Sequence, residues 1–138
     1  MRKLKDILQD IELLDHTGSL DQEIGSLHFD SRKAEAGSLF VAIKGLTVDG
    51  HDYIEKAVEK GAEAVVCEKM PASLKNGTSY LVVEDTALAL GKMASNFYGN
   101  PSQKLKLIGI TGTNGKTTTA TLLYKLFRHH GMHTGLIS

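Results

Sequence analysis

The feature that most constrains this chain is a loop rich in glycine and threonine, which lies between an apolar stretch and an amphipathic one. Residues 109–119 of the loop read Gly-Ile-Thr-Gly-Thr-Asn-Gly-Lys-Thr-Thr-Thr. The apolar residues 105–110 predict a strand before the loop, and the leucine spacing in 116–130 predicts a helix that ends at Gly131. A strand, a glycine-rich turn and a helix in this order are the parts of a phosphate-binding loop.

Such a loop binds phosphate mainly through its backbone, because successive N–H groups point into one concavity at a helix N-terminus. We expect Lys116 to act on the β- and γ-phosphates as the catalytic residue, and the Thr117 hydroxyl to coordinate Mg²⁺. A purely structural turn has no need of a lysine where the helix dipole disfavours cations. The predicted nucleotide contacts are Gly112, Thr113, Asn114, Gly115, Lys116, Thr117 and Thr118.

The loop departs from the general P-loop pattern at one position. That pattern requires glycine five residues before Gly115, where this chain has Ile110. The sequence Thr-Gly-Thr-Asn-Gly-Lys-Thr-Thr at 111–118 instead resembles the shortened ATP-binding loop of the Mur ligases and their relatives, the folylpolyglutamate and cyanophycin synthetases. This resemblance implies an ATP-dependent amide ligase.

The residues before the loop alternate strand and helix patterns. We expect a helix at 4–11, strands at 26–29, 39–43, 64–67 and 80–83, and helices at 52–60 and 86–97. Thr86 is the predicted N-cap of the last helix, and Tyr53 and Phe97 are predicted core residues. No helix pattern separates the first two strands, so the sequence predicts an α/β fold with a mixed sheet.

Residues 99–103, Gly-Asn-Pro-Ser-Gln, break the helical pattern and predict a domain boundary. We therefore expect a small mixed-sheet N-terminal domain at 1–100. We expect 105–138 to form the first strand–P-loop–helix unit of a P-loop ATPase domain, followed by the start of another strand at 134–138 and truncated by the end of the sequence.

Motifs in the first domain extend the resemblance. The sequences His-Phe-Asp-Ser-Arg at 28–32, Gly-Ser-Leu-Phe-Val-Ala at 37–42 and Asp-Gly-His at 49–51 resemble the N-terminal domain of MurE-type and MurF-type ligases. Asn114, with three threonines after the lysine, is closer to the MurE type. The resemblance implies that 1–100 binds the uridine end of the substrate, through residues that match the family's contacts by position: Phe29, Ser31, Leu46, Thr47 and Val48. Asp30 and Arg32 have a simpler interpretation, in which they pin the loop by hydrogen bonds.

The resemblance also implies a reaction for the full-length protein. With ATP and Mg²⁺, it would add a diamino acid, meso-diaminopimelate or lysine, to UDP-N-acetylmuramoyl-L-alanyl-D-glutamate through an acyl phosphate, in peptidoglycan precursor synthesis. We expect this chain by itself to be inactive. The alternatives are a MurF-type ligase that adds D-alanyl-D-alanine, a non-catalytic nucleotide-sugar binding module, and an unrelated P-loop kinase or GTPase.

Composition excludes several other classes. Sixteen lysines and arginines balance 16 aspartates and glutamates, which offers no electrostatic footprint for nucleic acid or an anionic membrane. No apolar run approaches the roughly 20 residues that span a bilayer, and no histidine pair has metal-ligand spacing. The single cysteine, Cys67, lies in an apolar stretch and indicates a reducing compartment. We expect a cytoplasmic monomer with no nucleic-acid or membrane partner.

Overall fold

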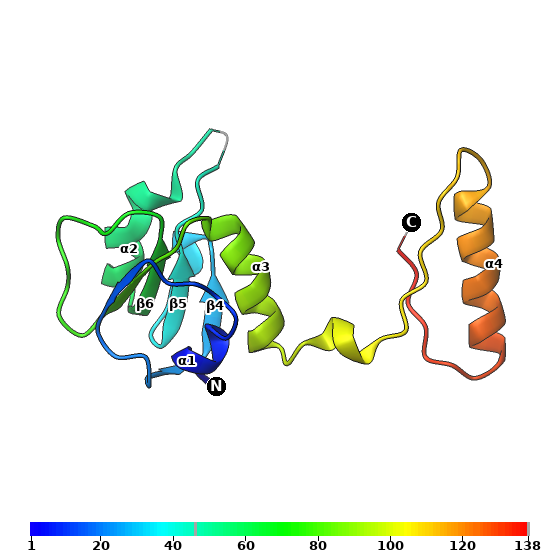
Figure 1. The fold of residues 1–138 in the computed structure, drawn as a ribbon, viewed down its shortest axis with the longest axis horizontal. Helices are drawn as coiled ribbons and strands as arrows, with labels where there is room; N and C mark the ends of the chain where they lie inside the picture. The colour runs from blue at the N-terminus through cyan, green and yellow to red at the C-terminus, as the bar shows by residue number, and fades with distance from the viewer. Residues whose placement is uncertain (46, 138) are drawn as a thin grey trace. The chain divides into compact units, whose positions relative to one another are not determined.

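The computed structural model describes residues 1–45 and 47–137, which form two compact units, Met1–Lys104 and Leu105–Ser138. The division follows a short 3-10 helix, η3 (Pro101–Lys104), which overlaps the segment 99–103 where the sequence predicts a domain boundary. Each unit has its own secondary structure (Figure 1).

The first unit is built on a five-stranded sheet with the strand order β2-β7-β6-β5-β4. The strands are β2 (Asp15–Thr17), β4 (Ser26–His28), β5 (Ser38–Val41), β6 (Ala62–Cys67) and β7 (Ser79–Val82). Strands β4 to β7 run parallel, and β2 pairs antiparallel with β7 at one edge. The predicted α/β fold with a mixed sheet is therefore confirmed. A separate antiparallel pair joins β1 (Arg2–Lys3) to β3 (Glu23–Ile24).

Helices cover both faces of this sheet (Figure 1). One face packs against α1 (Leu4–Ile7) and α3 (Thr86–Phe97), and the other against α2 (Ile54–Glu59). Successive residues of a strand point to opposite faces, so Leu39 and Val41 join the first core cluster whereas Phe40 and Ala42 join the second. Burial on both faces explains the largely apolar sequences of the strands β5, β6 and β7.

The second unit contains α4 (Lys116–His129), which starts where the sequence predicts. Gly131 adopts φ +76 and ends it with two hydrogen bonds, from Gly131 N to Arg128 O at 3.1 Å and from Met132 N to Phe127 O at 3.0 Å. This is a Schellman motif, in which the glycine supplies the left-handed residue. The predicted C-terminal stop at Gly131 is thus confirmed.

The strands predicted at 105–110 and 134–138 are wrong for the residues that the structure describes. A strand exists only with a hydrogen-bonded partner, and neither 105–110 nor 134–137 is paired within the described ranges. The apolar side chains that suggested the first strand are largely exposed, Leu107 by 91%.

Two smaller predictions in the first unit are also wrong. The N-cap of α3 is Asp85, whose carboxylate accepts a hydrogen bond from Leu88 N at 2.8 Å, while Thr86 is fully buried as the first helical residue. Tyr53 is 39% exposed, because it lies at the junction of the 3-10 helix η2 (Gly50–Tyr53) and α2. Phe97 does pack against the first core cluster, as predicted.

None of the described helices has both the length and the apolar composition needed to cross a bilayer.

Candidate functional site: a sheet edge and a phosphate loop

The four parallel strands of the first unit have their carboxyl ends on the same side of the sheet, which we call the sheet edge. Strand β4 is followed by Phe29 and the 3-10 helix η1 (Ser31–Lys33), and β5 by the loop 44–49. Strand β6 is followed by Glu68 and β7 by Asp85. In open α/β sheets, ligands bind outside the carboxyl ends of the strands, so this edge is the candidate binding region of the unit.

The turn after β4 holds two of the predicted substrate contacts. Phe29 is 65% exposed, whereas Ser31 is buried at the start of η1. Asp30 accepts hydrogen bonds from Arg32 N at 2.9 Å and from Arg32 Nη2 at 2.9 Å. These bonds hold the pKa of Asp30 at about 2, below its ordinary value of 3.8. The prediction that Asp30 and Arg32 pin this turn is confirmed.

The loop after β5 holds the other predicted contacts. Thr47 and Val48 are exposed, and Leu46 lies outside the described residues. Gly45 N donates to Val48 O at 2.9 Å, and a Cβ on Gly45 would lie 2.7 Å from that same oxygen. Only glycine therefore permits this tight loop. Since β4 and β5 are neighbours with His28 opposite Phe40, both groups of predicted contacts start from adjacent strand ends.

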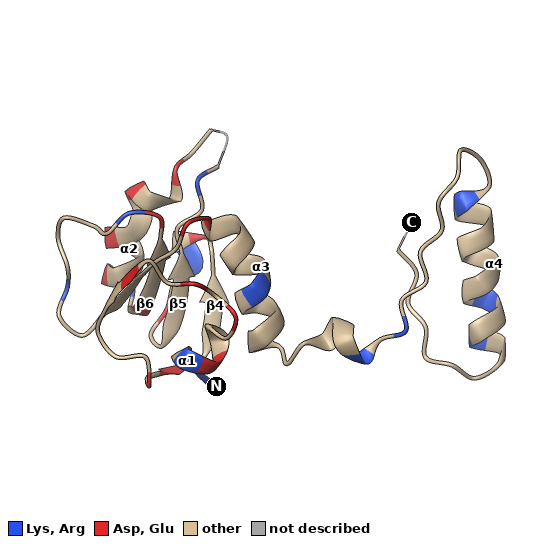
Figure 2. Cartoon of the chain, in the orientation of Figure 1, with Lys and Arg blue, Asp and Glu red and all other residues tan. Residues whose placement is uncertain are grey.

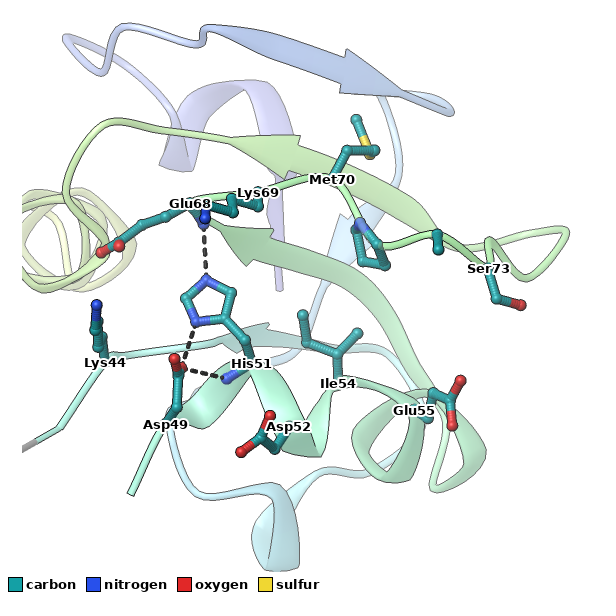
Figure 3. A pocket seen from close by; sticks show the side chains of 12 residues that line it. Lys44, Asp49, His51, Asp52, Ile54, Glu55, Glu68, Lys69, Met70 and Ser73 are labelled. Carbon is teal, nitrogen blue, oxygen red and sulfur yellow. Dashed lines mark hydrogen bonds and ion pairs between the residues drawn. The ribbon is translucent and has the colours of Figure 1, made fainter. Parts of the chain in front are cut away.

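Beside this loop is a cavity of about 500 Å³ (Figure 3). It lies between the 44–55 segment and the residues that follow β6, with both acidic and basic side chains around it. Its lining includes Lys44, Asp49, His51, Asp52, Glu68 and Lys69.

A chain of hydrogen bonds crosses one wall of the cavity. His51 Nδ1 lies 2.6 Å from Asp49 Oδ1, and Glu68 N donates to His51 Nε2 at 2.9 Å (Figure 3). The Glu68 carboxylate in turn accepts from Thr86 N at 3.2 Å and from Thr86 Oγ1 at 3.0 Å. This network could not be predicted from the sequence. Its only local signal is the Asp-Gly-His motif at 49–51, and the partner residues lie far along the chain.

The loop predicted to bind phosphate contains two glycines with positive φ. Gly112 has φ +152 and Gly115 φ +75, conformations that other residues rarely adopt. Gly115 is the N-cap of α4 and supplies no side chain to cap it. The Lys116 ammonium turns back over the loop, where it donates to Gly112 O, and to Thr113 O at 3.4 Å.

The N-terminus of α3 provides an internal comparison. There the orphan N–H groups are met by the chain's own carboxylates, those of Asp85 and Glu68. The first turn of α4 contains Lys116, Thr117 and Thr118 and no acidic residue. The N–H groups at this helix end are therefore available to an external anion, such as a phosphate.

Charge is divided unevenly along the chain (Figure 2). All 16 acidic residues lie in Met1–Lys104. Among Asp, Glu, Lys and Arg, Leu105–Ser138 contains only the basic types: Lys106, Lys116, Lys125 and Arg128. The net charge of zero thus conceals a basic second unit, which favours a phosphate ligand there. No group of three His, Cys, Asp or Glu side chains suited to a metal ion occurs in 1–45 or 47–137.

Comparison with known proteins identifies the family. The family model described as "Mur ligase family, catalytic domain" matches residues 23–98, more than half of the chain. The chain belongs to the Mur ligase family. The match covers β3 to α3 of the first unit, and the predicted phosphate loop at 109–119 lies outside it.

The relatives include the UDP-N-acetylmuramoyl-L-alanyl-D-glutamate–2,6-diaminopimelate ligase of Bacteroides fragilis. It is 55% identical over 99% of this chain, and the chain spans 28% of its length. The corresponding ligase of Cytophaga hutchinsonii is 50% identical, with the same coverage of 99% and 28%. The chain therefore spans under a third of the curated relatives that it matches.

Solved structures of the family have the same fold. A UDP-N-acetylmuramoyl-L-alanyl-D-glutamate–2,6-diaminopimelate ligase superposes on 95% of this chain with a TM-score of 0.62 and 25% identity, using 26% of its own length. A MurF ligase from Thermotoga maritima in complex with ADP superposes on 78% of the chain with a TM-score of 0.54 and 32% identity, using 24% of its own length.

Proposed function

We propose that this chain is the N-terminal part of a MurE-type ligase, which adds 2,6-diaminopimelate to UDP-N-acetylmuramoyl-L-alanyl-D-glutamate. The observation that carries the proposal is the N-terminus of α4, which has Gly115 as its N-cap and no side-chain cap. The Lys116 ammonium lies at the same loop, where it donates to Gly112 O. Such a site suits the phosphates of ATP, and a Mur ligase with ADP is among the structural neighbours.

The MurE type is favoured over the MurF type by sequence identity. Relatives named as the diaminopimelate ligase are 42–55% identical over 98–99% of the chain. The MurF structures of Acinetobacter baumannii are 35% identical over 77% of it. These relatives support diaminopimelate, rather than lysine or D-alanyl-D-alanine, as the amine substrate.

In this proposal the second unit opens the ATP-binding domain. Backbone N–H groups of 112–118 hold the phosphates, Lys116 neutralises charge on the β- and γ-phosphates, and the Thr117 hydroxyl holds Mg²⁺. ATP supplies the phosphoryl group that activates the substrate carboxylate for attack by the amine. The task of these residues is positioning and charge neutralisation around that group.

The first unit, 1–100, binds the uridine end of the substrate in this proposal. Phe29 and Ser31 after β4, together with Leu46, Thr47 and Val48 after β5, form the contact region at the sheet edge. The exposed Phe29 ring offers an apolar face for a base, and the tight 44–49 loop offers backbone groups. Because ATP and UDP-sugars are cytoplasmic metabolites, we place the protein in the cytoplasm.

The phosphate-loop assignment is tested by Lys116→Ala in the full-length ligase. We expect kcat to fall by at least about a hundredfold, because a charge that acts on the transferred phosphoryl group is lost. Calorimetry with UDP-N-acetylmuramoyl-L-alanyl-D-glutamate should give an unchanged Kd. Lys125→Ala, which removes an exposed lysine from the same helix, is the matched control. Full turnover by Lys116→Ala would refute the assignment.

The role of the first unit is tested by binding alone. The 138-residue chain should bind the UDP-linked dipeptide and bind UDP itself more weakly, as measured by calorimetry. A folded chain that binds neither would contradict the proposed role, and binding without ATP-dependent turnover in the full-length protein would favour the non-catalytic nucleotide-sugar module.

A further inference from the structure

The Asp49–His51 pair resembles the acid–histidine pair of a catalytic site, and it lines an open cavity. A histidine that acts as a general base needs one ring nitrogen free to take a proton. Here Nδ1 is bonded to Asp49 Oδ1 at 2.6 Å, and Nε2 accepts the Glu68 N–H at 2.9 Å. Both nitrogens are occupied by the protein, so His51 does not serve as a base in this arrangement.

The bond from Glu68 fixes the protonation of the ring. A backbone N–H can only donate, so Nε2 must be the unprotonated nitrogen. The proton of the neutral ring is then on Nδ1, from which it is donated to Asp49. The same Asp49 oxygen also accepts the His51 backbone N–H at 3.0 Å, so His51 makes two hydrogen bonds to Asp49 and one to Glu68, the residue that follows β6.

The network holds the 44–49 loop at both of its ends. The backbones of Lys44 and Asp49 pair in an isolated antiparallel β-bridge that closes the loop. Next to it, Gly50 N donates to Ile43 O at 2.8 Å. His51 joins this closure to the end of β6, and Glu68 joins β6 to the buried Thr86 at the start of α3. Loop, strand and helix are therefore connected in one hydrogen-bonded chain, which reduces the entropy that ligand binding would otherwise have to remove from the loop.

We propose that His51 is a positioning residue for the nucleotide end of the substrate, which acts by clamping the 44–49 loop to β6 and α3 in its Nδ1–H tautomer. This inference rests on the proposed function, in which Thr47 and Val48 contact that end of the substrate. It requires no direct contact between His51 and the substrate.

Two substitutions separate the two bonds of the ring. His51→Asn keeps an N–H at the position of Nδ1 but lacks an acceptor for Glu68 N, whereas His51→Gln places a carbonyl oxygen near the position of Nε2. In the full-length ligase, His51→Asn should raise the KM for the UDP-linked dipeptide about tenfold, the effect of one lost hydrogen bond. The kcat and the KM for ATP should stay within about twofold, and His51→Gln should restore most of the substrate KM.

The matched controls are His16→Asn and His16→Gln, which make the same changes at an exposed histidine on the distant edge strand β2. If His51→Asn is too unstable to assay, Asp49→Asn is the milder variant. It keeps an oxygen acceptor for His51 but loses its charge, so the substrate KM should rise about threefold.

The outcomes distinguish this inference from the function on which it rests. Wild-type protein that does not bind the UDP-linked dipeptide overturns the proposed function and this inference with it. Wild-type binding together with an unchanged substrate KM in folded His51→Asn overturns the inference alone. So does an equal loss of activity in His51→Asn and His51→Gln without a rise in that KM, because it would assign His51 a general structural role.

Discussion

At the scale of single residues, two side chains of the first unit have pKa values shifted in opposite directions. Hydrogen bonds from Arg32 lower the pKa of Asp30 to about 2, and burial raises the pKa of the Cys67 thiol to about 11. The first shift favours a charged carboxylate in the folded state, and the second favours a neutral thiol. Each shift makes the protein's stability depend on pH in its own range.

Asp30→Asn should destabilise the first unit at neutral pH, because the amide replaces a charged acceptor of the Arg32 hydrogen bonds. The folded-state pKa of Asp30 is depressed, so its contribution is complete above pH 3.8 and is lost as the pH falls to about 2. Melting temperatures of variant and wild type should therefore converge over this range. Asp6→Asn, at an exposed carboxylate on α1, is the control, and an undiminished gap as the pH falls through about 2 would contradict the prediction.

Cys67 should resist alkylation in the folded protein. Its thiol is buried and donates to Leu81 O at 3.6 Å. With a pKa of about 11, only about one molecule in a thousand carries a thiolate at pH 8. Mass spectrometry after iodoacetamide treatment should show modification only in denaturant, and since the chain has one cysteine the signal has one source. Because the folded-state pKa of Cys67 lies above its ordinary value of 9.0, the free energy of unfolding should fall as the pH rises from 9.0 through about 11. Rapid alkylation of native protein would show that the thiol is accessible.

At the scale of elements, the two long helices begin in different ways. Helix α3 is capped by its own carboxylate Asp85 and by Glu68, whereas α4 begins at Gly115 with no side-chain cap. An N-cap satisfies orphan N–H groups and stabilises the folded protein. The start of α4 forgoes that stabilisation, which is consistent with a site kept for an external anion.

Asp85→Ala should lower the free energy of unfolding of the first unit by about 1 kcal/mol, the usual cost of losing an N-cap. Urea titration followed by circular dichroism would measure it. Glu84→Ala, which removes the adjacent exposed carboxylate outside the helix, is the matched control. Equal effects of the two substitutions would show that Asp85 acts through charge alone rather than through its bond to Leu88 N.

At the scale of the whole molecule, the two units differ in how much apolar surface they bury. Met1–Lys104 contains two core clusters, one on each face of its sheet. In the second unit no residue of 105–137 is buried, and Leu105, Leu107 and Ile108 are each more than half exposed. Burial of apolar surface is the main source of folding free energy, so the first unit should be the stable part of this chain.

A protein comprising residues 1–104 should therefore fold cooperatively by itself, whereas 105–138 should remain unfolded. Thermal unfolding of 1–104 should give one transition close to that of the 138-residue chain, and the isolated 105–138 peptide should show none. Hydrogen exchange on the intact chain is the control, with protection expected in β5 and β6 and little in α4. Strong protection of α4 would contradict this division.

Local sequence signals were sufficient where one segment determines its own structure. The start of α4 after Gly115 and its stop at Gly131 each depend on residues within one turn. The α/β order followed from alternating strand and helix patterns. Family membership followed from the motifs at 28–32, 37–42 and 49–51 together with the loop, and the comparisons confirm it.

Structure that depends on a partner elsewhere in the chain was not readable in this way. Strand β2 exists because β7 accepts it as an edge, and 105–110 lacks a strand because no partner pairs with it among the described residues. His51 shows the same dependence most clearly, since its tautomer is set by a backbone N–H 17 residues away. By itself the sequence determined the family and the fold class, because the motifs and alternating patterns that signal them are local. The phosphate-binding role of 112–118 stays a prediction. Only the tertiary structure decided which nitrogen of His51 carries the proton and which elements hold the 44–49 loop, because packing brings β5, β6 and α3 to one edge of the sheet.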